Sequence, residues 1–387
     1  MSALAIKNIG LLITGDLDAP LSKDNTIIVI NGKIEAIGGQ ELISKYQCDK
    51  VIDANGTTVA PGFIDSHTHP VLGDFTPRQN TVGFINSSLH GGVTTMISAG
   101  EPHTPGRPKD VSGAKALAIL AHKSSQNVRP GGVKLHGGAV ILEQGFTERD
   151  FIDLKKEGVW LVGEVGLGTV KDPSEAAPLI EMAKKYGMKV MMHTGGTSIP
   201  GSSTIGFEDV VTAKPTVVSH VNGGPTSIPI EDVKKLIDET DFILEIVHCG
   251  NSKVMKEAVE YAVEKNQLHR FIIGNDSPSG TGIIPLSILR VVSYLASVCN
   301  IPAEKAVCMA TGNTADVYEL NVGKIEKGRE ADFVIMDAPM GSVGSNSIEA
   351  LAAGDLCGIS NVIVDGKIMF EKSKNTPPAV RKSKVIK

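Results

Sequence analysis

The sequence predicts an α/β protein: a (β/α)8 barrel of the TIM type with a small β-sandwich domain built from both chain ends. Three observations predict this fold. Short apolar runs alternate with amphipathic helical stretches through the middle of the 387-residue chain. About eight such runs fall within about 260 residues, which is the usual size of such a barrel. Both chain ends instead carry β-rich runs separated by Gly turns.

The chain ends share one style of short strand. Each of three β-rich pairs surrounds a dipeptide that favours a tight hairpin turn, namely Asn31-Gly32, Asn55-Gly56 and Asp365-Gly366. We therefore expect residues 1–60 and 323–387 to form one β-sandwich domain, with the barrel in residues 61–322 between them.

Within the middle segment, the expected strands lie near residues 61–66, 93–98, 132–136, 159–164, 188–193, 216–220, 242–247 and 271–275. Helical patterns fill the intervals, for example at 147–157, 174–187 and 253–266. An open, doubly wound sheet is the structural alternative. The lack of a G-x-G-x-x-G pattern after an early strand weighs against it.

Composition excludes several classes of function. The chain is 41% hydrophobic and 21% charged, and its net charge of −5 contains no long run of one sign, so neither nucleic acid nor an anionic membrane is an expected partner. No run approaches the ~18 apolar residues of a membrane span, and the N-terminal residues lack a signal-peptide core. The five scattered cysteines include no C-x-x-C pair, which favours a reducing cytoplasm.

Polar residues cluster where the predicted strands end, which is where barrels of this type place their chemistry. Four histidines and two carboxylates stand there: His67, His69, Glu164, His193, His220 and Asp276. Alone, a strand-end His is more often structural, and Asp276 in NDSPSG fits a turn. Together the six suit two divalent ions, because imidazole and carboxylate favour zinc, iron, nickel or manganese. Glu164 is placed to bridge the two ions.

The motifs PGFIDSHTH, GND and GKIEKGREADFVIMD, together with His193 and His220, resemble the amidohydrolase superfamily over nearly the whole chain. Many members carry a carboxylated lysine on the fourth strand, where this chain has Glu164. The segments VWLVGEVGLGTVKDP, HTGGTSIPGSSTIG and GNDSPSGTGIIPLSILR are similar to the enamidase family of nicotinate breakdown, in which a glutamate bridges the metals.

The resemblance implies a hydrolase that opens a cyclic amide at two divalent ions, zinc or iron. His67, His69 and Asp276 would hold one ion, His193 and His220 the other, and Glu164 both. Asp276 would also be the catalytic acid and base. The implied reaction converts 6-oxo-1,4,5,6-tetrahydronicotinate, an anionic cyclic amide, to 2-formylglutarate and ammonia. A homo-oligomer, by resemblance a tetramer, is expected.

The substrate carboxylate needs a donor, and several residues are candidates. Arg78, Arg107, Lys109 and Lys134 are the cationic candidates, although each also fits a solvated surface charge. Thr197 lies in a Gly-rich loop with Thr194 and Ser198 that could bind an anion or be only a tight turn. His248, after the seventh strand, could contact substrate or support the metal ligands.

Other functions stay open on the sequence. A cyclic amidase resembling dihydroorotases or hydantoinases would share the metals and differ in its pocket. A purine or pyrimidine deaminase fits less well, because HTGGT and HVNGG lack a His-x-x-Glu acid. A non-catalytic scaffold would have lost metal ligands, and all six candidates are present.

Overall fold

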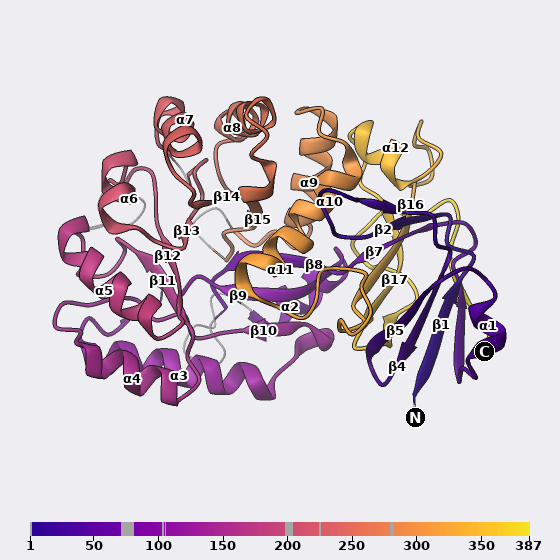
Figure 1. Ribbon diagram of the computed structural model, residues 1–387, viewed down its shortest axis with the longest axis horizontal. Helices are drawn as coiled ribbons and strands as arrows, with labels where there is room; N and C mark the ends of the chain where they lie inside the picture. The colour runs from indigo at the N-terminus through magenta and orange to yellow at the C-terminus, as the bar shows by residue number, and fades with distance from the viewer. Residues whose placement is uncertain are drawn as a thin grey trace.

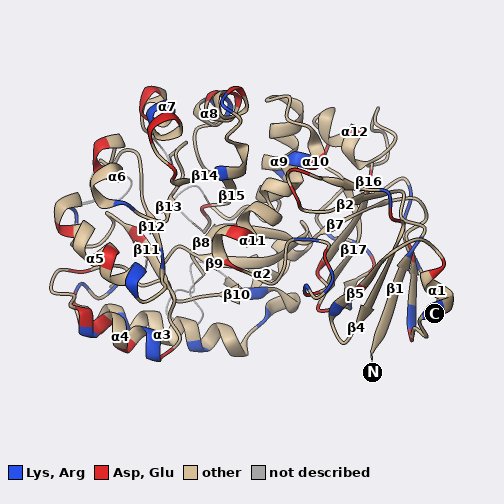
Figure 2. Cartoon of the chain, in the orientation of Figure 1, with Lys and Arg blue, Asp and Glu red and all other residues tan. Residues whose placement is uncertain are grey.

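The computed structural model describes residues 2–70, 81–102, 104, 106–197, 204–223, 226–278 and 282–387. Figure 1 shows a ring of helices around parallel strands and, beside it, a β-rich part that contains both chain ends. Figure 2 shows acidic and basic residues interspersed on the outer helices. No helix of the described residues has the length and apolar character to cross a membrane.

The middle of the chain supplies the eight strands inside the ring of helices. They are β8 (Phe63–Thr68), β9 (Val93–Ser98), β10 (Lys134–His136), β11 (Leu161–Val165), β12 (Lys189–Met192), β13 (Val217–Val218), β14 (Ile243–Val247) and β15 (Phe271–Gly274). Strands β8 to β10 pair in parallel, and so do β11 to β15.

Two junctions close these groups into a barrel. Between β10 and β11, the Val140 amide donates to the Leu161 carbonyl at 3.0 Å, and the Gly163 amide donates to the Val140 carbonyl at 2.8 Å. Between β15 and β8, Thr68 and Ser277 form a parallel bridge. The predicted (β/α)8 barrel is confirmed, and the open doubly wound sheet is excluded because the eight described strands leave no open edge.

Helices surround the barrel: α2 (Thr81–Leu89), α3 (Val111–Asn127), α4 (Glu148–Lys156), α5 (Pro173–Lys185), α6 (Phe207–Ala213), α7 (Ile230–Glu239), α8 (Ser252–Glu264), α9 (Ser287–Ser297), α10 (Ala303–Met309) and α11 (Gly312–Tyr318). Side chains Asp110, Asp172 and Asn251 cap α3, α5 and α8 by accepting from backbone amides of the first turn.

Strand alternation divides the barrel core into two layers. Ile64, Leu161 and Ile272 belong to an inner cluster that also contains Tyr318 of α11. Their neighbours Val162 and Ile273 belong to the larger cluster that joins the strands to the outer helices. Both faces of each strand are covered, and β11 to β15 are largely apolar, so they stood out in the sequence; β8 and β9 bury polar residues as well.

The β-rich part contains two sheets. One has the order β19 (Lys384–Val385), β6 (Lys50–Asp53), β1 (Ala3–Lys7), β4 (Thr26–Ile30) and β5 (Lys33–Gly38). The other has the order β18 (Lys367–Phe370), β17 (Gly358–Val364), β16 (Phe333–Asp337), β7 (Thr58–Pro61), β2 (Leu11–Ile13) and β3 (Leu21–Ser22). Two short helices, α1 (Leu42–Lys45) and α12 (Ser347–Ala352), also lie outside the ring.

Both sheets combine strands from the two chain ends. The domain boundaries at 60/61 and 322/323 stay a prediction.

Two of the three predicted hairpin turns join paired strands. Asn31-Gly32 connects β4 to β5 and Asp365-Gly366 connects β17 to β18, and all four residues have positive φ. The third was wrong as a hairpin. Asn55-Gly56 has the same backbone conformation, but β6 and β7 belong to different sheets, so this turn leads from one sheet to the other.

Lys134 connects the barrel to the β-rich part. It begins β10, and its Nζ lies 2.6 Å from Glu330 Oε2, 2.8 Å from Asp332 Oδ2 and 2.8 Å from Asp365 Oδ1. The Asp332 side chain is only 1% exposed. As a substrate-binding candidate Lys134 was wrong, because it stands at the N-terminal end of its strand, away from the strand ends that carry the histidines.

Replacing Lys134 by Met should destabilise the protein by about 3 kcal/mol, because Asp332 would stay buried without its cation. The free energy of unfolding in urea measures this loss. Lys327→Met is the matched control: Lys327 pairs with Glu35 at 2.8 Å, but its side chain is 70% exposed, so its loss should leave stability unchanged. Equal stability of the two variants would contradict a stabilising role for the ion pairs of Lys134.

Candidate metal centre

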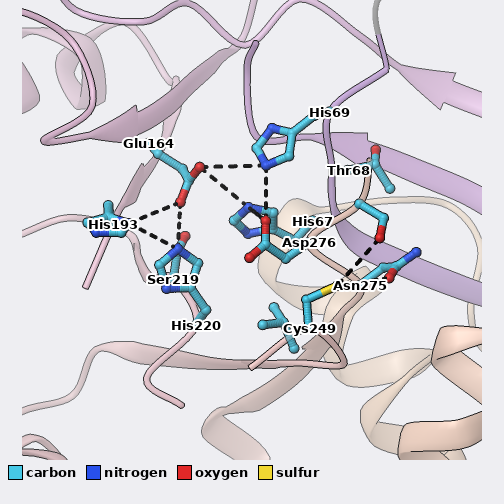
Figure 3. Close-up of polar contacts among 12 residues, drawn as sticks. His67, Thr68, His69, Glu164, His193, Ser219, His220, Cys249, Asn275 and Asp276 are labelled. Atoms are coloured by element: carbon cyan, nitrogen blue, oxygen red, sulfur yellow. Dashed lines mark hydrogen bonds and ion pairs between the residues drawn. The ribbon is translucent and has the colours of Figure 1, made fainter. Parts of the chain in front are cut away.

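The two histidines at the end of β8 are held by their Nδ1 atoms and present Nε2 to a common space (Figure 3). His67 Nδ1 lies 2.7 Å from Glu245 Oε2, and His69 Nδ1 lies 2.7 Å from the Gly100 carbonyl oxygen. Both acceptors require a proton on Nδ1, so the lone pair of each ring is on Nε2. The buried Nε2 of His67 has no hydrogen-bond partner among the described residues.

Glu164, in β11, stands between two pairs of imidazoles. Its Oε1 lies 2.7 Å from His220 Nε2 and 3.7 Å from His193 Nδ1. Its Oε2 lies 3.6 Å from His67 Nε2 and 3.7 Å from His69 Nε2. Each oxygen of one buried carboxylate therefore faces its own pair of histidines, which is the arrangement that a bridging ligand needs.

His193 and His220 follow β12 and β13. His193 Nε2 lies 3.2 Å from the Gly196 carbonyl oxygen, which places the proton there and turns Nδ1 toward the centre. This Nδ1 lies 3.2 Å from His220 Nε2. Two lone pairs that face each other repel, so either one of these nitrogens carries a proton or both bind one metal ion.

Asp276 completes the first histidine pair. It follows β15, its backbone amide donates to the His67 carbonyl at 2.9 Å, and its φ is 60°. Its Oδ1 lies 3.1 Å from His69 Nε2 and 3.6 Å from His67 Nε2. Gly274 permits this approach, because a Cβ there would lie 2.6 Å from that of His67.

The separations fit metal coordination. Two ligand atoms about 2.1 Å from one tetrahedral ion lie about 3.4 Å from each other. The candidate ligand atoms named above lie mostly 3.1–3.7 Å apart. Two groups, His67 with Glu164 and His220, and His67 with His69 and Asp276, each offer ligand atoms within 4.8 Å of one another. The residues therefore fit a pair of divalent ions.

The electrostatics of the centre favour positive charge. Burial lowers the pKa of His67, but the Glu245 and Glu164 carboxylates outweigh it and raise that pKa well above its ordinary value. Burial likewise opposes ionisation of Glu164, but His67 and the other imidazoles hold its pKa well below the usual range. Carboxylates that favour a proton on these rings also favour a metal cation in the same place.

Glu245 was missed by sequence reasoning. It lies in β14, is fully buried, and accepts from both His67 Nδ1 and the Ser66 hydroxyl. Such a carboxylate fixes the tautomer and direction of its histidine. The available signal was an acidic residue inside the apolar run FILEIV, since a buried charge needs a specific partner.

Asp65 is a second buried carboxylate that holds the candidate ligands in position. Its Oδ1 accepts from the amides of Asn275 at 2.9 Å and His67 at 3.3 Å. Burial raises the pKa of Asp65 to about 7. The carboxyl joins the ends of β8 and β15, which carry three of the six candidate ligands.

The predicted substrate-binding residues are dispersed. Arg78 and Ser198 lie outside the described residues. Arg107 forms an ion pair with Glu143 and lines a small cavity together with Gly100. Thr197 and Lys109 are exposed, and His248 lines a separate cavity that none of the six candidate ligands lines. Their roles toward substrate stay predictions.

Comparison with known proteins decides the family, since the sequence profile of the amidohydrolase family matches residues 58–369. The chain belongs to the amidohydrolase family. This amidohydrolase is 58% identical to an enamidase of Eubacterium barkeri over 386 residues, covering 100% of both chains. A solved enamidase structure superposes with a TM-score of 0.97 at 58% identity, again over 100% of each chain.

More distant relatives of this amidohydrolase have other activities. A dihydroorotase of Clostridioides difficile is 22% identical, over 83% of this chain and 88% of its own length. A solved β-aspartyl dipeptidase from Fervidobacterium islandicum has a TM-score of 0.66 at 16% identity, covering 98% of this chain and 99% of its own, and shows the fold alone.

Replacing Glu245 by Ala should lower metal affinity by about 10- to 100-fold, because His67 would lose the partner that fixes its tautomer. Metal retained during titration with a chelator measures this change. Glu143→Ala is the matched control: Glu143 is equally buried but accepts from Arg107 and the Thr169 amide instead of a candidate ligand. Equal metal affinity in the two variants would contradict a positioning role for Glu245.

Proposed function

We propose that this amidohydrolase hydrolyses a cyclic enamide at a two-metal centre, with 6-oxo-1,4,5,6-tetrahydronicotinate as its substrate. The observation that carries the proposal is the position of Glu164 between the two histidine pairs. A glutamate in this place separates the enamidase family from the many relatives that use a carboxylated lysine. The 58% identity to an enamidase over the full chain supports the same assignment.

The proposed ligand sets follow the two oxygens of Glu164. His67, His69 and Asp276 would hold one ion, His193 and His220 would hold the other, and Glu164 would contribute to both. Zinc or iron suits a set of imidazoles and carboxylates. Such ions supply a water of lowered pKa and polarise the carbonyl of a bound lactam.

Asp276 is the proposed acid and base. Its carboxylate lies within the cluster, where it can accept the proton released by the attacking water and deliver it to the ring nitrogen. The amide C–N bond breaks, leaving a carboxylate and an enamine. The enamine tautomerises to an imine, which takes up a second water and releases ammonia to leave the aldehyde. The stoichiometry is two waters consumed for each ammonia released.

A dihydroorotase-like or hydantoinase-like cyclic amidase is the alternative function, and the 22% identity to a dihydroorotase favours it less. A non-catalytic scaffold is disfavoured because all six candidate ligands lie together. A homotetramer and a cytoplasmic location belong to the proposal and rest on the sequence resemblance and on cysteine usage.

The decisive assay incubates the metal-loaded protein with 6-oxo-1,4,5,6-tetrahydronicotinate and, separately, with dihydroorotate. The first reaction is monitored by ammonia release and mass spectrometry. The second is monitored by the disappearance of the dihydroorotate ring. We expect ammonia and 2-formylglutarate from the first compound at a kcat on the order of 10 s⁻¹, and no reaction of the second. Opening of dihydroorotate alone would establish the alternative function instead.

Asp276→Asn is the informative variant for the same assay, because it keeps a ligand oxygen but removes the base. Its kcat should fall by about 10²- to 10⁴-fold while metal content, measured in the same sample, is retained. Asp238→Asn, at an exposed helix position, is the control and should behave like the unaltered protein. Near-normal turnover by a fully metallated Asp276→Asn protein would overturn the role of Asp276.

A further inference from the structure

A second cavity lies outside the barrel, between its last helices. It has a volume of about 320 Å³ and is bounded by residues from the start of α8, one face of α9 and the segment after α12. Tyr294 of α9 joins two of these walls, since its hydroxyl donates to the Ser252 carbonyl at 2.8 Å. The described lining residues are His248, Ser252, Met255, Arg290, Val291, Ser293, Tyr294, Ser297, Gly354 and Leu356.

The charge of this cavity is positive. Arg290 lines it and has no ion pair or side-chain hydrogen bond within the described part of the chain. None of the described lining residues is acidic. A guanidinium group presents a planar fork of donors that matches a carboxylate or a phosphate. An unpaired Arg at a cavity wall without a neighbouring acid therefore favours an anion.

His248 adds an unsatisfied polar atom. Its Nδ1 is buried and has no hydrogen-bond partner among the described residues. Burial, followed by the charge of Arg290, lowers the pKa of His248, so the ring is neutral and can donate one hydrogen bond. This Nδ1 is enclosed by the protein, so a ligand in the cavity would contact another edge of the imidazole.

The rest of the lining limits the ligand. Met255, Val291 and Leu356 supply apolar surface, whereas Ser293 and Ser297 turn their hydroxyls to backbone carbonyls, Ser297 to that of Ser293 at 2.6 Å. A volume of about 320 Å³ is at the small end of the range for ligand pockets. The cavity is therefore too small for a dinucleotide.

We propose that this cavity binds a small organic carboxylate with a compact apolar body. The carboxylate pairs with Arg290 and His248, and the body packs on Met255, Val291 and Leu356. This site is separate from the metal centre, because its described lining includes none of the six candidate ligands. The proposal therefore does not depend on the activity proposed above.

Isothermal titration of the metal-loaded protein with benzoate, acetate and inorganic phosphate tests the proposal. Benzoate should bind most tightly, because acetate lacks the apolar body and phosphate gains nothing from the apolar wall. Arg290→Met should raise the Kd for benzoate by about tenfold or more, and Arg290→Lys, which keeps charge without the fork, should raise it less. Each variant should keep its melting temperature, because residue 290 is exposed.

Two further variants of this protein test where benzoate binds. Glu164→Gln removes the carboxylate proposed to be shared by the two ions, and Arg149→Met removes an exposed Arg of α4 that pairs with Asp153. Both variants should bind benzoate as the unaltered protein does. Loss of binding in Glu164→Gln would place benzoate at the metals and overturn the proposal. No binding at about 10 mM benzoate, unchanged binding by Arg290→Met, or equal affinity for phosphate would overturn it too.

Discussion

The central interaction of this structure is the double contact of Glu164, one buried carboxylate whose two oxygens face two different pairs of imidazoles. A carboxylate taken out of water is costly unless positive charge compensates it. Here the surrounding groups are histidines, which compensate it only when they share protons or metal ions. The need for cations at this point is therefore built into the packing of the barrel.

The closed barrel makes this contact possible. The candidate ligands come from the ends of β8, β11, β12, β13 and β15, which lie far apart along the chain. Closure through the β15–β8 bridge brings Asp276 beside His67 and His69. A surrounding set of acceptors, namely the Gly100 and Gly196 carbonyls and the Glu245 carboxylate, then fixes the ring nitrogen that His67, His69 and His193 present.

Much of this architecture follows from local patterns in the sequence. Most barrel strands contain an apolar run covered on both faces, so their positions were visible without knowledge of their neighbours. The six candidate ligands were found because they end such runs. Glu245 was not found, because its partner His67 lies on a strand distant in sequence. The ion pairs of Lys134 and the passage of the chain from one sheet to the other at Asn55-Gly56 were not predicted for the same reason. Both depend on which distant segments pack together.

Anomalous diffraction from crystals of the metal-loaded protein, collected at the zinc and iron absorption edges, tests the central claim most directly. We expect two peaks, one on either side of the Glu164 carboxylate, each about 2.0–2.2 Å from its ligand atoms. One should contact His67 and His69, and the other His193 and His220. A single peak, or peaks that Glu164 does not contact, would contradict a shared carboxylate at a two-metal centre.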